Sequence, residues 1–258
     1  MQLAKHITQG KLTYLSQGDN ALSVSENEHY RWLAFAGEHG EQVIQSIMLK
    51  RKPWKLTLPH QTALMLPLLF FKPNSVAELG LGGGNVQRFI KHTSSLITIH
   101  SIEHSRLVID CFNQYFNPSS NETKAIYSDS KVWLQQNNIS YDWFICDIYQ
   151  EDIQSYNNTV SQLEDITEHI KSTTCLSINL PDASDREVNL LLTLLQQLSP
   201  HHDITYFHIP NYLNIVIHLI PKQWQTYKKL KRNHHSYLPN AVFSRWKKFW
   251  LHGKNVSL

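Results

Sequence analysis

The sequence has few cysteines and no long apolar run. Its three cysteines, Cys111, Cys146 and Cys175, lie far apart and form no Cys-x-x-Cys pair, which argues against a disulfide framework or a thiolate zinc site. The longest apolar run, residues 64–71, is far shorter than the roughly 20 residues of a membrane-spanning helix. The first residues show no apolar stretch with a cleavage site. We therefore expect a protein of the cytoplasm with no membrane partner.

The sequence also lacks any recognisable metal-ligand pattern. It contains 15 histidines, but none belongs to a His-Glu-x-x-His motif. His100 and His104 have helical spacing, yet His100 falls in a predicted strand, so the two side chains would not share a helical face. We expect no metal site.

The order of apolar runs predicts an α/β fold. Residues 10–58 carry short alternating runs broken by glycine, which is typical of a small antiparallel β unit. From residue 75 strands and helices alternate, which predicts a Rossmann-like, doubly wound, mostly parallel sheet with helices on both faces. We therefore divide the chain into an N-terminal β domain (1–58), a Rossmann-like domain (59–221) and a basic, aromatic C-terminal extension (222–258).

A glycine-rich loop follows the predicted strand 75–79 and precedes the predicted helix 86–92. It reads Glu78-Leu79-Gly80-Leu81-Gly82-Gly83-Gly84. Glycines allow a sharp turn and a close approach of the backbone to a ligand, while a helix N-terminus offers unpaired N–H groups and positive potential. We interpret the loop as a ligand-binding turn in which Glu78 orients the backbone or binds an amino group. The alternative is a β-to-α turn without a ligand.

Three acidic residues follow the next predicted strands. Glu103 comes nineteen residues after Gly84, at the distance where nucleotide-binding βαβ units carry an acid on the ribose hydroxyls. Asp129 and Asp147 follow the third and fourth strands, so their side chains would face the same crevice. Asp129 could accept a hydrogen bond from an adenine amine, and Asp147 could act as a base or orient an acceptor. Ordinary loop acids are the alternative for all three.

Several segments together resemble the spermidine synthase family over roughly residues 10–220. They are Ala77 to Gly84, Ser101-Ile102-Glu103, Tyr127-Ser128-Asp129, Tyr141 to Asp147, Pro59-His60-Gln61 and Pro67-Leu68-Leu69. The resemblance implies an N-terminal β domain on a methyltransferase-like fold, and aminopropyl transfer from decarboxylated S-adenosylmethionine to a diamine. It also implies Glu103 on the ribose, Asp129 on the adenine, Gln45 at the family's glutamine contact and Asp147 in the catalytic position. Family members tend to form homodimers.

The chain departs from this family where the amines bind. Asn85 follows Gly84 where the family has aspartate, and Pro59-His60-Gln61 replaces its Tyr-His-Glu. Lys55-Leu56 replaces an acidic pair, and after Asp147 the chain reads Ile148-Tyr149-Gln150-Glu151 where the family has a second acid and a proline. Glu151 or Asp152 could replace part of the missing acid. A pocket for a dication should not gain a lysine and lose acids.

These departures order the functional predictions. We predict methyl transfer from intact S-adenosylmethionine to an unidentified small-molecule acceptor. Aminopropyl transfer from decarboxylated S-adenosylmethionine to an unusual amine is the second reading, and a non-catalytic protein that binds an adenosyl ligand is the third.

The C-terminal extension has nine Lys and Arg and no acidic residue, whereas the remainder of the chain has 15 Lys and Arg against 21 Asp and Glu. Cations interleaved with aromatic residues suit RNA binding. Trp246, Phe249 and Trp250, however, have the spacing of the apolar stripe of a docked helix. We favour docking over a nucleic-acid-binding arm.

Overall fold

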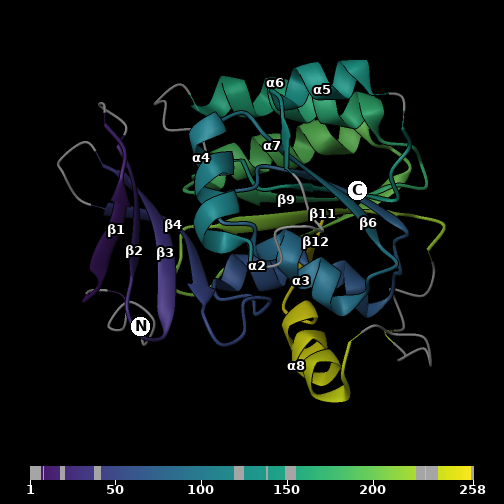
Figure 1. The fold of residues 1–258 in the computed structure, drawn as a ribbon. Coiled ribbons are helices and arrows are strands. Elements are labelled where there is room, and N and C mark those ends of the chain that lie inside the picture. Colours follow the sequence, from purple (N-terminus) through teal and green to yellow (C-terminus); the bar gives the residue numbers. More distant parts are fainter. Residues whose placement is uncertain are drawn as a thin grey trace.

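The computed structural model of the protein describes Ile7, Leu230 and residues 9–17, 21–37, 42–118, 125–137, 139–148, 155–224 and 238–256, without the side chains of residues 155 and 156. Within this part of the chain a small antiparallel sheet lies beside a larger α/β unit (Figure 1). This arrangement confirms the predicted fold class.

The small sheet contains four antiparallel strands in sequential order. They are β1 (Lys11–Leu15), β2 (Leu22–Glu26), β3 (Tyr30–Ala36) and β4 (Gln42–Leu49). Leu22, Val24 and Leu33 are buried and pack against Val108 and Phe112 of the larger unit. Trp32, Ala34 and Ile47, which alternate with the residues of this cluster, form a second buried cluster, so both faces of the middle strands are covered.

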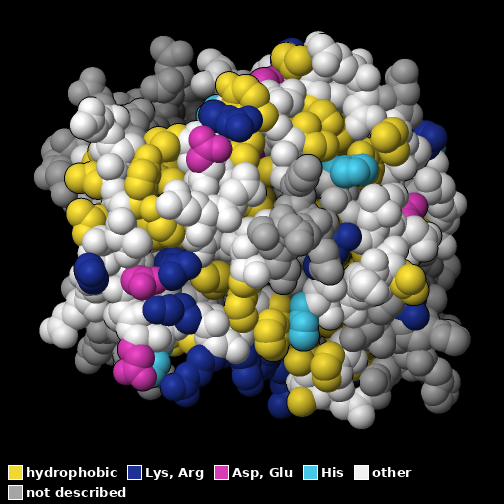
Figure 2. Space-filling view, viewed as in Figure 1, with side chains coloured by type: hydrophobic (Ala, Val, Ile, Leu, Met, Phe, Trp, Pro, Cys, Tyr) yellow, Lys and Arg dark blue, Asp and Glu magenta, His cyan; other side chains and the backbone are white. Residues whose placement is uncertain are grey.

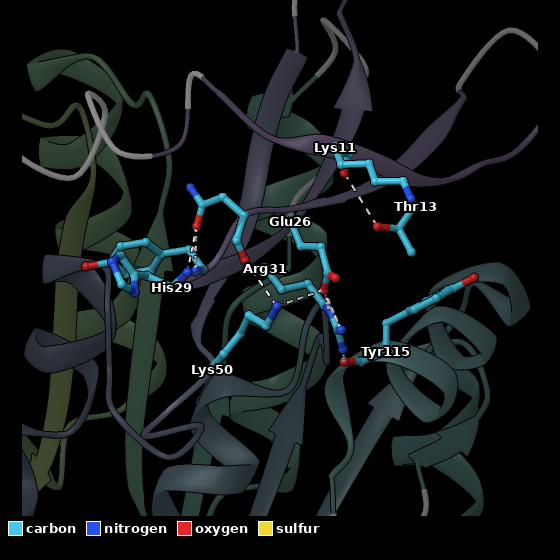
Figure 3. Close-up of polar contacts among 9 residues, drawn as sticks. Lys11, Thr13, Glu26, His29, Arg31, Lys50 and Tyr115 are labelled. Atoms are coloured by element: carbon cyan, nitrogen blue, oxygen red, sulfur yellow. Dashed lines mark hydrogen bonds and ion pairs between the residues drawn. The ribbon is translucent and has the colours of Figure 1, made fainter.

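A polar contact also joins the small sheet to the larger unit. Arg31 of β3 donates a hydrogen bond to the backbone carbonyl of Tyr115, and its Nε lies 2.7 Å from Oε2 of Glu26 (Figure 3). The Nζ of Lys50 lies 3.5 Å from the same oxygen. Glu26 therefore holds Arg31 in position for its contact across the junction.

The larger sheet contains eight strands in the order β12-β10-β11-β9-β8-β5-β6-β7. Adjacent strands from β9 to β7 are parallel, and the pairings of β11 with β9, β10 with β11 and β12 with β10 are antiparallel. The strands are β5 (Ser75–Leu79), β6 (Thr98–Glu103), β7 (Ala125–Tyr127), β8 (Trp143–Cys146), β9 (Cys175–Leu180), β10 (His202–His208), β11 (Ile215–Pro221) and β12 (Lys254–Asn255).

Helices cover both faces of this sheet (Figure 1). On one face lie α5 (Ser130–Gln136), α6 (Ser155–His169) and α7 (Asp185–Leu198). On the other lie α2 (Pro59–Leu64), the 3₁₀ helix η1 (Leu66–Leu69), α3 (Asn85–Thr93) and α8 (Asn240–Trp250). Beside the small sheet, α4 (Arg106–Cys111) continues into the π-helix η2 (Phe112–Phe116). Strands β8 and β9 are buried along their whole length because both of their faces are covered.

The described part of the C-terminal extension packs on the larger unit at two places. Helix α8 buries Phe243, Trp246 and Trp250, and the ring of Trp250 lies 5.0 Å from that of Phe70. Strand β12 then adds to the edge of β10. Residues 225–229 and 231–237, which carry four of the nine cations, lie outside the described residues.

The structure differs from the sequence-based expectation in two elements. The apolar run of residues 96–102 predicts a strand that begins at Leu96, but β6 begins at Thr98 because residues 95–97 form a turn. Helix α6 was not predicted at all, since its sequence is polar and rich in residues that weakly favour helix. The three cysteines are free and buried, as expected. None of the described helices combines the length and apolar composition that crossing a bilayer requires.

Candidate functional site

A cavity of about 760 Å³ lies at the carboxyl ends of the parallel strands. This volume falls within the roughly 300–1,000 Å³ of small-ligand pockets. Both the small sheet and the Rossmann-like unit line it. The structure brings most of the sequence-predicted site residues to its wall, namely Gln45, Glu78, Gly80, Gly82, Glu103, Asp129 and Asp147. Gly83 and Gly84 lie in the same loop and contact the elements behind it.

The glycine loop needs its glycines for two reasons. Gly80, Gly82 and Gly84 have positive φ angles of 91°, 50° and 69°, a region that other residues rarely adopt. A Cβ atom on Gly80 would lie 2.4 Å from the backbone oxygen of Asp147. One on Gly84 would lie 2.2 Å from the ring of Phe112. The loop is therefore packed tightly between the end of β8 and η2.

Strand β4 of the small sheet supports the same loop. The backbone N–H of Gly83 donates to Oγ of Ser46 at 2.9 Å. In the ladder with β3, Leu33 pairs with Ser46 and Ala34 pairs with Ile44, so Gln45 is an extra residue at a bulge. Bulges re-aim side chains, and Gln45 is part of the cavity wall. The antiparallel sheet thus forms one side of the site.

Glu103 ends β6 and is buried, with 7% of its surface exposed. Its Oε2 accepts the backbone N–H of Leu81 at 3.1 Å, and its Oε1 accepts that of Ser105 at 3.0 Å. His104 Nδ1 lies 3.2 Å from Oε1. The carboxylate therefore joins the glycine loop to the start of α4. It also lies at the cavity wall, where its remaining lone pairs can accept hydrogen bonds from ligand hydroxyls.

Glu78 is the most buried acid of the site, with 1% of its surface exposed. It accepts a hydrogen bond from Oγ of Ser101, which in turn accepts one from Gln87 at 3.0 Å. Burial raises the pKa of Glu78 to about 8. At neutral pH the carboxyl group is thus mostly protonated and uncharged, which suits orientation of the loop better than ion pairing with a ligand amine.

Asp129 has a structural role that the sequence did not reveal. Its Oδ1 accepts the backbone N–H groups of Lys131 at 2.9 Å and Val132 at 3.1 Å, so it is the N-cap of α5. The residue is exposed and lines the cavity. Among the described residues no hydrogen bond is made to its Oδ2, which leaves that oxygen available to a ligand.

Asp147 stands at the end of β8 in a short polar chain. Its Oδ1 accepts a hydrogen bond from Nδ2 of Asn179 at 2.7 Å. Oδ1 of Asn179 accepts one from Nδ2 of Asn214 at 3.1 Å. All three residues line the cavity, together with Tyr212. The aspartate is therefore oriented from β9 and from the connection between β10 and β11.

Asn85 lies at the first position of α3 and is buried. Its Nδ2 lies 2.9 Å from the carbonyl oxygen of Ile47 and 3.1 Å from Oε1 of Gln61, and its Oδ1 accepts from Arg88. Arg88 also donates to the carbonyl oxygens of Phe116 and Gly83. A neutral amide at this position is thus fully used in joining β4, α2 and α3.

His60 completes this part of the wall. It lies in the first turn of α2, and its Nδ1 is buried with no hydrogen-bond partner among the described residues. Burial lowers the pKa of His60, although the charge of Asp147 opposes this. The imidazole is therefore neutral at pH 7. Among the described residues no group of three or more His, Cys, Asp or Glu is arranged to hold a metal ion.

Sequence reasoning missed several of these residues. The apolar run of residues 174–179 predicts a strand that ends at Asn179, so the strand-end rule that pointed to Asp147 would also have found Asn179. Gln61 was identified only as a departure from the family pattern, and no local pattern indicates its contact with Asn85, 24 positions away. The same holds for the contact of Ser46 with Gly83, 37 positions away. Residues 149–154, where the family pattern expects a second acid and a proline, lie outside the described residues.

No protein-family model matches the chain, and no curated protein matches it in sequence. Solved structures do match its fold. A probable spermidine synthase from Corynebacterium glutamicum is 15% identical with a TM-score of 0.64, and the match covers 83% of this chain and 80% of that one. The chain has the fold of spermidine synthases.

Two further structures support this fold. The spermidine synthase from Thermotoga maritima is 15% identical with a TM-score of 0.61, covering 92% of this chain and 88% of that one. Human methyltransferase-like protein 13, solved in complex with SAH, is 16% identical with a TM-score of 0.56, covering 78% and 96%. The spermidine-synthase-like fold of this chain therefore includes the methyltransferase-like sheet, as predicted.

Proposed function

We propose that the chain is an S-adenosylmethionine-dependent methyltransferase that acts on an unidentified small-molecule acceptor. The observation that carries the proposal is the hydrogen bond between the amides of Asn85 and Gln61. The resemblance to spermidine synthases leads us to expect acids at both positions. Here two neutral amides are hydrogen-bonded to each other, and Arg88 donates to the oxygen of Asn85, so these two positions offer no acid that would select a cationic aminopropyl group.

The geometry fits an adenosyl ligand. The glycine loop is already turned, and Leu81 and Gly82 direct their backbone N–H groups to Glu103. We assign the ribose hydroxyls to Glu103 and the exocyclic adenine amine to Oδ2 of Asp129. Gln45 faces the same cavity from β4. When bound, S-adenosylmethionine supplies the electrophilic methyl group on its sulfonium.

The acceptor would lie beside Asp147. Asn179 holds the carboxylate of this residue through Oδ1, so its other oxygen can accept a proton from the acceptor or orient its nucleophilic atom. The cavity wall also includes Asn179, Asn214, Tyr212 and His60. Neutral amides recognise hydrogen-bonding groups rather than charge. This lining supports an acceptor that is not a dication.

Isothermal titration with S-adenosylmethionine and its decarboxylated form tests the proposal. We expect the intact form to bind more tightly. Tighter binding of the decarboxylated form would favour the second candidate, aminopropyl transfer. This candidate is supported by the small antiparallel sheet and by the structural match to the Thermotoga maritima spermidine synthase, which covers 92% of this chain. Binding of neither adenosyl ligand would contradict both. Binding without turnover over a panel of acceptors would leave a non-catalytic adenosyl-binding protein.

A further inference from the structure

Two segments far apart in sequence are basic and contain no acid. Residues 50–77 carry five Lys and Arg, and residues 238–256 carry four, and neither segment has an Asp or Glu. Helix α3 has Arg88 and Lys91 and likewise no acid. The sequence alone presents these as separate runs of charge.

The fold joins them into one surface through α3. Nε of Arg88 donates to the carbonyl oxygen of Pro53 at 2.9 Å, which holds the turn at residues 50–55 against the helix. On its other side, the ring of Phe89 lies 5.6 Å from that of Trp246 in α8. Turn 50–55, α3 and α8 are therefore neighbours, and we call their outer surface the basic face. Figure 2 shows Lys and Arg side chains gathered along the lower edge of the molecule.

The cations of the basic face are accessible. Lys52, Lys55, Arg245 and Lys248 are exposed, and no ion pair involves them within the described part of the chain. The side chain of Arg51 is 79% exposed and lies 4.0 Å from the equally exposed carboxylate of Glu28. Docking of α8 buries its aromatic stripe and leaves the cations on the outer side. Among the described residues no acid neutralises Lys52, Lys55, Arg245 or Lys248.

An aromatic platform lies within the same face. The indole of Trp54 stacks on the imidazole of His92, with ring centroids 4.1 Å apart and planes 19° apart. Trp54 is 36% exposed and His92 is exposed. A large aromatic ring that stays accessible among cations offers a surface on which a nucleic-acid base can stack.

We propose that the basic face binds single-stranded nucleic acid, with phosphates on its cations and a base on Trp54. A membrane surface fits less well, because the apolar side of α8 is already buried against the protein and cannot enter a bilayer. The site is separate from the cavity, since Trp54 and His92 lie at the carboxyl end of α3 and the glycine loop lies at its amino end. The proposal is independent of the transferase function.

The test is fluorescence anisotropy with labelled oligouridylate and oligothymidylate of about 15 nucleotides, the length that such sites cover. We expect binding at low salt that weakens as salt rises. The double variant Arg245→Glu/Lys248→Glu should bind at least about tenfold more weakly, with a salt slope smaller by about 2. Trp54→Ala should lose about fivefold in affinity with an unchanged salt slope, because it removes stacking and no charge.

The matched control is Lys171→Glu/Arg186→Glu, which changes the net charge by the same amount as Arg245→Glu/Lys248→Glu. Both control positions are exposed and lie on the other face of the sheet, Lys171 just after α6 and Arg186 in α7. This control should bind like the unmodified protein. Equal weakening by both double variants would overturn the proposal, since it would show an effect of net charge alone. So would absence of binding at low salt, or binding to vesicles of anionic phospholipid but not to the oligonucleotides.

Discussion

The side-chain amides of Asn85 and Gln61 form a hydrogen bond, with Nδ2 of Asn85 3.1 Å from Oε1 of Gln61. One residue begins α3 and the other lies in α2, and both are buried. Two carboxylates at this separation would repel each other unless a cation lay between them. The two departures from the spermidine synthase pattern are thus physically coupled, since the Asn85 amide donates to the Gln61 oxygen.

Asn85→Asp tests this coupling. The variant loses the donor that faces the Ile47 carbonyl and Gln61, whereas its ion pair with Arg88 offsets part of the loss. We expect a loss of about 1–2 kcal/mol in unfolding free energy and a shift of binding preference towards decarboxylated S-adenosylmethionine. Thermal unfolding and titration measure the two effects. Gln162→Glu adds the same charge elsewhere on the cavity wall and should change neither as much. Equal shifts in both variants would refute the coupling.

Glu103 and Asp129 should differ in their importance for the ligand. In the unmodified protein both carboxylate oxygens of Glu103 accept backbone N–H groups, whereas Glu103→Gln retains only one acceptor oxygen. We therefore expect the affinity for the adenosyl ligand to fall about tenfold or more. Asp129→Asn keeps an oxygen to cap α5, so stability should change by less than about 0.5 kcal/mol and affinity only a few-fold. Titration with S-adenosylhomocysteine compares them. A larger loss in the Asp129 variant would contradict our assignment of the ribose.

The glycines of the loop should also be unequal. Alanine at position 80 would place its Cβ 2.4 Å from a backbone oxygen in addition to its unfavourable φ, whereas alanine at position 82 would meet only the Ser46 hydroxyl, at 3.1 Å. We expect Gly80→Ala to cost about 3 kcal/mol or more and Gly82→Ala about 1–2 kcal/mol. Urea unfolding measures both. Similar losses of unfolding free energy in the two variants would show that the backbone around Asp147 shifts more easily than its close packing indicates.

Glu78 should make stability depend on pH. Burial raises its pKa from 4.5 to about 8, so between these values the folded state keeps a proton that the unfolded state has released. Its contribution to the unfolding free energy is therefore complete below about pH 4.5 and is lost as pH rises to about 8. Glu78→Gln remains neutral and can still accept from Ser101. Relative to the unmodified protein, this variant should gain a few kcal/mol between about pH 5 and pH 8, as measured by denaturant unfolding. A constant difference across that range would argue against a buried neutral acid.

The sequence by itself determined the elements that depend on neighbouring residues. The strand Ser75–Leu79, its glycine loop and the helix that follows are local, because turn geometry and apolar periodicity act over a few residues. The placement of Glu103, Asp129 and Asp147 at one edge follows from strand order alone, since parallel strands end on the same side. Helix α6 escaped prediction because packing of Leu163 and Ile166, rather than its weak intrinsic preference, stabilises it.

Only the tertiary structure decided what these residues contact. Ser46 supports Gly83, Gln61 pairs with Asn85, and Asn179 orients Asp147, and each contact spans more than 20 positions of sequence. The same holds for the basic face, where α3 brings the turn around Trp54 beside α8. Such contacts arise from the packing of whole helices and strands, so no local sequence pattern predicts them. The sequence thus indicated what ligand the loop could hold, and packing decided which charges surround it.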